Sequence, residues 1–161
     1  MFKKILLLAL LAVAFYVHAH VSFGDARVMS WLAGHTARAM SGEREACDDF
    51  TDDAEVTLLA KGRRGHWEVE GGKDEICGYY KQGSAALTVL QASANTQFDD
   101  LAVVRSGFPW RTATVSYVTR TSVNVRGAPA TTIESEDTVT LVRTMSGMKI
   151  KSLESRSTGG L

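Results

Sequence analysis

The chain has 161 residues, 45% of them hydrophobic and 22% charged, which is typical of one globular domain and too short for two ordinary ones. Because 18 lysines and arginines balance 18 aspartates and glutamates, no net field favours nucleic acid, an anionic membrane or an acidic substrate as the partner. The basic cluster Lys61, Arg63 and Arg64 occupies a single turn without interleaved aromatic residues, so we expect no nucleic-acid site there.

The N-terminus has the pattern of an export signal. Two lysines precede an uncharged apolar run of 13 residues, 5–17, and a small-residue cleavage pattern ends at Ala19. We interpret residues 1–19 as a signal peptide and residues 20–161 as one exported domain, periplasmic or extracellular. Because a helix needs about 20 apolar residues to cross a membrane, an uncleaved leader that anchors the chain is the alternative.

Export also affects how the two cysteines are interpreted. An oxidising compartment favours pairing, and Cys47 with Cys77 is the one pairing available. Such a bond is expected to stabilise the fold by about 3.6 kcal/mol in the chain-entropy model. Two separate buried thiols are the alternative. A catalytic thiol is disfavoured because neither cysteine has a histidine or basic residue nearby in the sequence to lower its pKa.

The exported domain is expected to begin with helices. Apolar residues at three- and four-residue steps predict an amphipathic helix over 25–42, with Ser22 or Asp25 as its N-cap. A second, short helix is predicted at 43–50, with Phe50 on its apolar side.

A β-hairpin and a third helix follow. Residues 51–53 are interpreted as a turn, and residues 54–60 and 66–70 as the two strands of the hairpin. The carboxylate of Asp74 suits the first turn of the third helix, in which Gly83 is a candidate break. The apolar face of this helix consists of Ile76, Tyr79, Tyr80, Leu87 and Leu90.

Alternating β-strands occupy the second half, and we expect all of them to be antiparallel neighbours. They are predicted at 97–106, 110–125, 133–144 and 149–155. In the second of them one face is apolar and the other consists of threonine, serine and arginine; the apolar face contains Ala113, Val115, Tyr117 and Val123. Residues 155–161 are interpreted as a frayed tail.

Several junctions in this order of elements carry a family resemblance. The segment FTDDAEV (50–56) leads into the first strand, and EGGKDEI (70–76) leads from the hairpin into the third helix. The segment DTVTLVR (137–143), with Lys-Ile at 149–150, closes the sheet. Over residues 25 to about 154 these segments resemble the nuclear transport factor 2-like superfamily, which also contains ketosteroid isomerase, scytalone dehydratase and polyketide cyclase-like proteins.

The resemblance implies an α+β cone, in which a strongly curved antiparallel sheet wraps around three helices from the N-terminal half of the chain. It also implies a small-molecule pocket at the open end of the cone, or a dimer face. Enzymes of the superfamily that isomerise or dehydrate place an acid or base inside the cone, where apolar walls change its pKa.

Candidate catalytic residues are few. His35 is the first candidate for a proton acceptor, because it shares a helical stripe with apolar residues, and Asp53 is the second. Tyr117 and Arg143 are the candidates for stabilising developing negative charge. The alternative for His35 is a surface or hydrogen-bonded core histidine. The other carboxylates near predicted strand starts are interpreted as solvated: Asp99, Asp100, Glu134, Glu136 and Asp137.

Aromatic residues supply the candidate walls of a pocket. Trp67 and Trp110 stand beside turns or strand starts and are placed at a pocket rim or an interface. Trp31, Tyr79 and Tyr117 complete the candidate lining together with His35. The alternative is that most of these rings fill the core.

No metal or cofactor is expected. His18 and His20 form a His-x-His pair, but cleavage after Ala19 separates them. The sequence also lacks the motifs of nucleotide binding, α/β-hydrolase chemistry and thiol redox.

Three functions are compatible with these features. The first is an exported cone-fold domain that binds a small apolar ligand or a protein partner without catalysis, favoured by the scarcity of inward acids and bases. The second is an isomerase, dehydratase or cyclase that uses an acid or base in the cone. The third is a structural or assembly component that forms a homodimer. A cavity in which His35 or Asp53 lies within hydrogen-bonding distance of another polar group distinguishes the second function.

Overall fold

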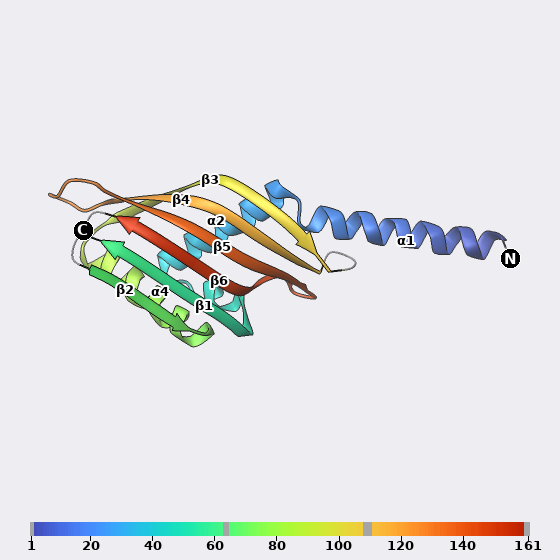
Figure 1. Cartoon of the computed structure of the whole chain (residues 1–161), viewed down its shortest axis with the longest axis horizontal. Coiled ribbons are helices and arrows are strands. Elements are labelled where there is room, and N and C mark those ends of the chain that lie inside the picture. Colours follow the sequence, from blue (N-terminus) through green and yellow to red (C-terminus); the bar gives the residue numbers. More distant parts are fainter. Residues whose placement is uncertain (1, 63–64, 108–110, 160–161) are drawn as a thin grey trace.

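The structure, a computed structural model, describes residues 2–62, 65–107 and 111–159 (Figure 1). Within these residues lie four helices: α1 (Phe2–Ser22), α2 (Asp25–Ser41), α3 (Glu45–Asp48) and α4 (Lys73–Val89). The same residues form six strands: β1 (Phe50–Gly62), β2 (Gly65–Gly71), β3 (Ser93–Ser106), β4 (Thr112–Asn124), β5 (Thr131–Thr144) and β6 (Gly147–Gly159).

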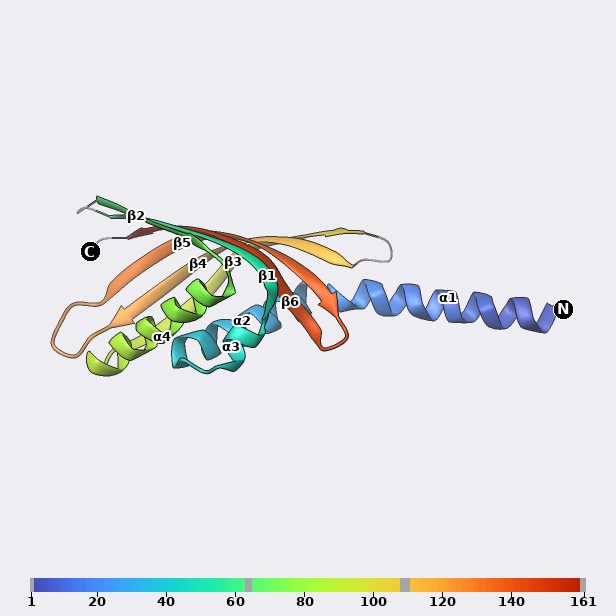
Figure 2. The same cartoon turned by 90° about the horizontal axis from the view of Figure 1, so that it is seen from below.

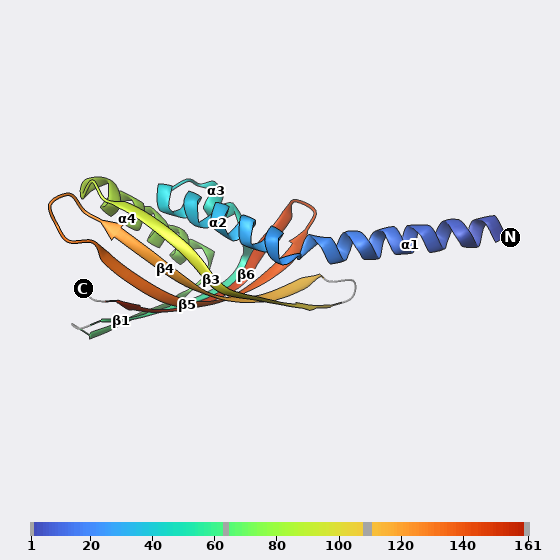
Figure 3. The ribbon, with the colours of Figure 1, turned by 90° about the horizontal axis from the view of Figure 1, so that it is seen from above.

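The described strands form one sheet in the order β2-β1-β6-β5-β4-β3. β1 and β6 are parallel, whereas every other neighbouring pair is antiparallel. Figures 2 and 3 show that the sheet is curved and that α2, α3 and α4 lie together on its concave side. The predicted α+β fold, with a curved sheet around helices from the N-terminal half, is confirmed, but the expectation of an antiparallel sheet is wrong for one pair, because β1 and β6 are parallel.

The first helix, α1, extends away from the sheet and leads into α2 (Figure 1). Its apolar side chains from Ile5 to Ala14 are exposed, Leu8 to 66%. None of the helices in the described residues is long and apolar enough to span a membrane. Cleavage after Ala19 and retention of the leader both stay predictions.

The core fills the space between α2, the start of α4 and the concave face of the sheet. On α2, the residues Val28, Leu32, His35 and Ala39 are buried, as the helical period predicts. The apolar face predicted for β4 is buried at Ala113, Val115 and Tyr117. The largest fully buried side chains are Phe23, Phe50, Leu32, Ile76, Leu141 and Ile150.

The start of α2 differs from the prediction. Neither Ser22 nor Asp25 is its N-cap; Gly24 takes that position in an extended conformation and supplies no side-chain cap. Arg105 of β3 anchors this end instead. Its Nε donates a hydrogen bond to the Phe23 carbonyl at 2.9 Å, and its guanidinium pairs with Asp25 at 3.1 Å.

The predicted turn at 51–53 is wrong, because β1 begins at Phe50 and runs through it. Phe50 pairs with Ile150, and the next pair joins Glu55 to Ser152, so four residues of β1 lie opposite one residue of β6. This bulge accommodates residues with turn propensity, and the pairing with β6 overrides that local preference.

The prediction of a frayed tail from residue 155 is also wrong. β6 continues to Gly159, with β1 on one side and β5 on the other. Its backbone groups find hydrogen-bond partners on both flanks, so the segment is ordered without a strongly apolar sequence.

The third predicted helix is unbroken and less buried than expected. α4 continues through Gly83, and of its predicted apolar face only Ile76 is fully buried, whereas Tyr79 and Leu90 are 44% and 54% exposed. Figure 2 shows the C-terminal end of α4 away from the sheet, which explains the exposure of that end.

Gly42 ends α2 in the left-handed region, with φ of 71°. A Cβ at this position would contact Ser84 Oγ of α4 and lie 2.9 Å from Ser84 Cβ. We therefore expect Gly42→Ala to lower the free energy of unfolding by about 1–2 kcal/mol, measured by urea denaturation. The control is Gly78→Ala within α4, where nothing lies within 4 Å of a Cβ. This control is expected to raise stability by about 0.5–1 kcal/mol, and a similar rise for Gly42→Ala would contradict the prediction.

Candidate functional site

A cavity of about 840 Å³ lies between the concave face of the sheet and helices α2 and α4. This volume is within the range of small-molecule sites, about 300–1,000 Å³. Its helix side is mostly apolar and aromatic, with Leu32, Met40, Ile76, Tyr79 and Tyr80. Its sheet side combines apolar residues with the hydroxyl groups of Thr96, Thr119, Thr121, Ser135, Ser155 and Ser157.

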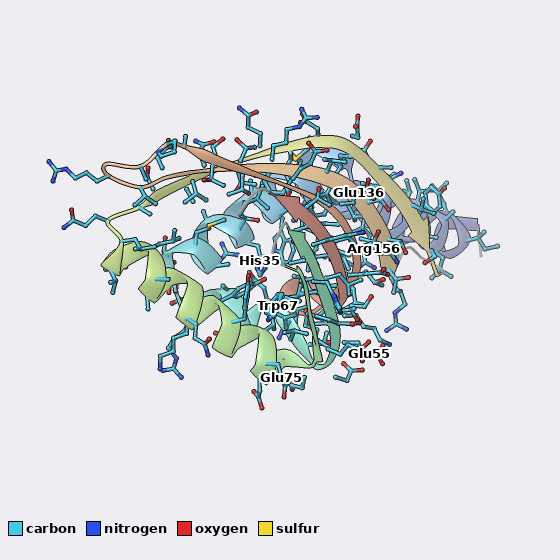
Figure 4. All side chains as sticks on the ribbon, turned by 60° about the vertical axis from the view of Figure 1, so that its left-hand side comes forward. His35, Glu55, Trp67, Glu75, Glu136 and Arg156 are labelled. Atoms are coloured by element: carbon cyan, nitrogen blue, oxygen red, sulfur yellow. A yellow bond between two sulfur atoms is a disulfide. The ribbon has the colours of Figure 1, made fainter. Side chains whose placement is uncertain are left out.

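His35 lies in the wall of this cavity, in the space between the helices and the sheet (Figure 4). Its Nδ1 lies 2.8 Å from Asp49 Oδ2, and its Nε2 lies 3.2 Å from the Tyr80 hydroxyl. Trp31 stacks on the imidazole with ring centroids 5.7 Å apart, and Phe50 meets its edge at 5.5 Å. These contacts fix the orientation of the ring between a carboxylate and a phenol.

The charge state of Asp49 determines which ring nitrogen of His35 carries the hydrogen. Burial acts to raise the pKa of Asp49, but hydrogen bonds from His35 and from Arg38, at 2.6 Å, outweigh burial and leave the pKa below its usual value. An ionised carboxylate is only an acceptor, so His35 Nδ1 carries the hydrogen. In the neutral imidazole, Nε2 then accepts the hydrogen bond that Tyr80 donates.

A pH-dependent contribution to stability follows from Asp49. Because its pKa is lowered in the folded protein, ionised Asp49 stabilises the fold above the ordinary aspartate value of 3.8. This contribution is lost as the pH falls through the lowered folded pKa. We expect Asp49→Asn to lower the free energy of unfolding by about 1.5–3 kcal/mol at pH 6, with a smaller difference at pH 3.

Urea denaturation of both proteins at the two pH values measures this difference. Asp53→Asn is the control, because Asp53 is exposed, and it is expected to change stability by less than about 0.5 kcal/mol at either pH. If the difference in the free energy of unfolding between wild type and Asp49→Asn is larger at pH 3 than at pH 6, the prediction that ionised Asp49 stabilises the fold is wrong.

Two tyrosines with covered rings, Tyr80 and Tyr117, face the cavity. Burial raises the pKa of both phenols above its ordinary value, and the negative charge of Asp137 adds to the effect. Both therefore stay protonated at neutral pH and are available as hydrogen-bond donors. Tyr117 is 9% exposed, and its hydroxyl makes no hydrogen bond to any described residue.

Asp137 also lies in the cavity wall, in the middle of β5 and only 9% exposed. Its interpretation as a solvated carboxylate at a strand start is therefore wrong. It shares the inward face of β5 with Ser135, Val139 and Leu141. Its Oδ2 accepts a hydrogen bond from Thr119 at 3.1 Å and its Oδ1 one from Ser135 at 2.9 Å.

The other predicted acid, base and cation lie elsewhere. Asp53 is exposed near the start of β1, and Arg143 lies in the part of β5 beyond the cavity; neither lines it. Of the remaining carboxylates, Asp99 and Glu134 pair with Arg120. Figure 4 shows Glu136 on the opposite side of the sheet from His35.

The aromatic candidates occupy different places. Trp67 and Tyr79 line the exposed edge of the cavity, with ring centroids 5.4 Å apart. Trp31 contacts His35 from outside the cavity and borders a smaller depression together with Asp49 and Met148. Trp110 lies outside the described residues.

A disulfide joins Cys47 of α3 to Cys77 of α4, and the predicted pairing is present in the structure. Cys47 stands two residues before Asp49, and Cys77 stands three residues before Tyr80. The bond therefore links the two segments that supply both hydrogen-bond partners of His35.

Sequence reasoning missed Asp49 and Asp137. A period-two count back from Leu141 and Val139 places Asp137 on the inward face of its strand, and this signal was available. Asp49 had no such signal, because it follows a single turn of helix and its partners Arg38 and His35 belong to another element.

Solved structures share this architecture. A nuclear transport factor 2-like protein with a cystatin-like fold from Novosphingobium aromaticivorans is 18% identical, with a TM-score of 0.64 over 91% of this chain and 86% of that chain. The chain has the nuclear transport factor 2-like fold. No family model and no curated protein matches it.

Two further structures with this nuclear transport factor 2-like fold carry enzyme names. One is a candidate scytalone dehydratase from Novosphingobium aromaticivorans, 14% identical over 81% of this chain and 80% of that chain, with a TM-score of 0.62. The other is a ketosteroid isomerase-like protein from Erwinia carotovora atroseptica, 14% identical over 83% and 95%, with a TM-score of 0.56. In the part of the chain that the structure describes, no three metal-binding side chains are placed to hold an ion.

Proposed function

We propose that this protein is an acid–base enzyme that moves a proton within a small, largely apolar molecule bearing a carbonyl or hydroxyl group, in an isomerisation or a dehydration. The observation that carries the proposal is the hydrogen-bonded group Asp49–His35–Tyr80, of which His35 and Tyr80 line a cavity of about 840 Å³. A carboxylate that orients an imidazole, whose other nitrogen faces a bound molecule, is the arrangement of a general base.

In the proposed first step, the Tyr80 hydroxyl moves from His35 to an oxygen of the bound molecule. The 3.2 Å separation between Nε2 and this hydroxyl is long for a hydrogen bond from a hydroxyl group. Little hydrogen-bond energy is therefore lost when Tyr80 leaves His35 and donates to the bound molecule instead. His35 Nε2 then takes a proton from carbon or oxygen of the substrate. The resulting imidazolium is stabilised by Asp49, which Arg38 helps to keep ionised.

In the second step the imidazolium returns its proton. Return to another carbon completes an isomerisation, and transfer to a departing hydroxyl group, which leaves as water, completes a dehydration. Tyr80 and Tyr117 donate hydrogen bonds to the oxygen on which negative charge develops between the two steps. Their raised pKa values suit this role, because a protonated phenol is required for donation.

Two observations favour this function over the alternatives. A domain that only binds an apolar ligand has no need of a histidine hydrogen-bonded to a carboxylate in its cavity wall, and a purely structural role is at odds with an open cavity of this size. The enzyme names of two structural neighbours add support for the same reaction class.

The experiment is a proton-exchange assay that needs no knowledge of the natural substrate. The protein is incubated in D₂O with 1-indanone or 4-phenyl-2-butanone, and proton NMR follows loss of the signal from hydrogens beside the carbonyl. We expect exchange to be faster than with the same concentration of free imidazole. We also expect Tyr117→Phe, which removes one donor, to slow it by about 10- to 100-fold. Exchange no faster than in the imidazole control, with every ketone tried, would count against the proposal.

We further propose that the enzyme works outside the cytoplasm. The disulfide between Cys47 and Cys77 supports an oxidising compartment, and the N-terminal pattern supports export. Native mass spectrometry of the protein recovered from its own compartment reports the mass after cleavage, the disulfide and the oligomeric state together. A mass that retains residues 1–19 would refute cleavage.

A further inference from the structure

The proposed mechanism leaves one buried charged group without a role. Asp137 projects from the middle of β5 into the cavity, 9% exposed, while its neighbour Glu136 lies on the opposite face of the sheet (Figure 4). Its hydrogen-bond donors, Thr119 and Ser135, are neutral hydroxyl groups. Each of its oxygens accepts one such bond, and a carboxylate oxygen can accept two.

Asp137 also lacks a countercharge. Within the described part of the chain it forms no ion pair, whereas the other covered carboxylate, Asp49, is paired with Arg38 at 2.6 Å. The basic side chains that line the cavity do not serve it: His35 Nδ1 is committed to Asp49. Lys61 and His66 are exposed and lie opposite each other in the register of the β1–β2 hairpin, at the edge of the sheet. A buried carboxylate held only by neutral donors is costly, and a cation supplied by a ligand offsets that cost.

Two aromatic residues of the cavity wall, Tyr117 and Tyr80, lie near Asp137. Tyr117 is directly opposite Asp137 on β4. Tyr80 lies on α4, and the charge of Asp137 adds to the effect of burial in raising the pKa of its phenol. Tyr117 is 9% exposed and lines the same cavity, and its hydroxyl has no hydrogen-bond partner among the described residues. Ring faces attract organic cations, most strongly where water is excluded.

From this combination we infer that the substrate carries a protonated amine, which binds Asp137 against the rings of Tyr80 and Tyr117. The substrate class is therefore an amine-bearing carbonyl or hydroxy compound with an apolar body. Leu32, Ile76 and Val139 contact that body. The inference rests on the proposed function, since it assumes that the cavity is the substrate pocket, and it adds the group that selects the substrate.

The test compares two probes of nearly equal shape, 4-phenylbenzylamine and 4-phenylbenzyl alcohol, by isothermal titration calorimetry at pH 7 with the disulfide intact. We expect the amine to bind about 10- to 100-fold more tightly than the alcohol, the usual gain of a hydrogen bond to a charged group. Asp137→Asn keeps the shape and removes the charge, so the amine should lose this advantage while the alcohol keeps its affinity within about threefold. Glu136→Gln is the matched control on the next residue of the strand and should preserve the wild-type preference.

The outcomes separate the two proposals. Equal affinity of the wild-type protein for both probes overturns the ammonium inference and leaves the proposed enzyme intact, and so does an amine preference that survives in Asp137→Asn. Binding of neither probe to the wild-type protein overturns the substrate pocket and the inference together. Because the wild-type preference is measured without any variant, the inference stays falsifiable even if Asp137→Asn fails to fold, which circular dichroism reports.

Discussion

Replacing His35 with glutamine is expected to slow the proposed proton exchange by about 10²- to 10⁴-fold, the usual contribution of a general base. The glutamine side chain can still accept a hydrogen bond from Tyr80, but its amide takes up no proton at neutral pH. The stacking partner Trp31 and the carboxylate of Asp49 remain in place, so the loss reports the missing base. Proton NMR in D₂O, with the ketones named above, measures the exchange rate.

His66→Gln is the matched control for this variant. His66 also borders the cavity, but it is exposed on β2 and its side chain makes no hydrogen bond or ion pair with any described residue. We expect its replacement to change the exchange rate less than about twofold. Wild-type exchange in His35→Gln would place the base elsewhere and refute the proposed mechanism.

Loss of the disulfide is expected to have the largest effect on stability. Cys47 and Cys77 are 30 residues apart, and closing a loop of this length contributes about 3.6 kcal/mol in the chain-entropy model. We therefore expect the double variant Cys47→Ser, Cys77→Ser to lower the free energy of unfolding by about this amount in urea denaturation. Because the bond ties the segments that hold Asp49 and Tyr80, we also expect slower proton exchange in the double variant under conditions in which it stays folded.

Chemical reduction supplies the control for the disulfide. A phosphine reductant should bring the wild-type protein close to the stability of the double variant and leave the double variant unchanged. If oxidised wild type and double variant unfold at the same urea concentration, the bond does not stabilise the fold. If the oxidised wild type and the double variant also exchange protons at the same rate, the disulfide does not position Asp49 and Tyr80 around His35.

The elements whose positions were predicted well share a strong local pattern. The stripe on α2 follows a helical period, and the inward residues of β4 follow a period of two, so each element shows its buried face in its own sequence. The errors occur where tertiary pairing overrides local preference. Residues 51–53 have turn propensity but extend β1, and residues 155–159 are polar but complete β6 between two neighbours.

The candidate site was predictable in part. His35 was singled out because a histidine on an apolar helical stripe must face either the core or a cavity, and Tyr117 because it alternates with buried residues. Asp137 obeys the same alternation, but its charge favoured a solvated interpretation, and only its position in the curved sheet shows that it faces the cavity. Asp49 and the role of Tyr80 were beyond prediction, because both depend on contacts between separate elements.

Local order in the amino-acid sequence was enough to predict an α+β domain, its helical first half and its strand-rich second half, since periodicity and composition act over a few residues. The pairing of Cys47 with Cys77 was favoured because the chain has only two cysteines and an export pattern. Folding in three dimensions decided the chemistry. His35 meets Asp49 from 14 residues away and Tyr80 from 45, and those contacts exist because α2, α3 and α4 pack together under one curved sheet. Side chains so far apart along the chain leave no local pattern, so their meeting in one cavity is a property of the packed structure.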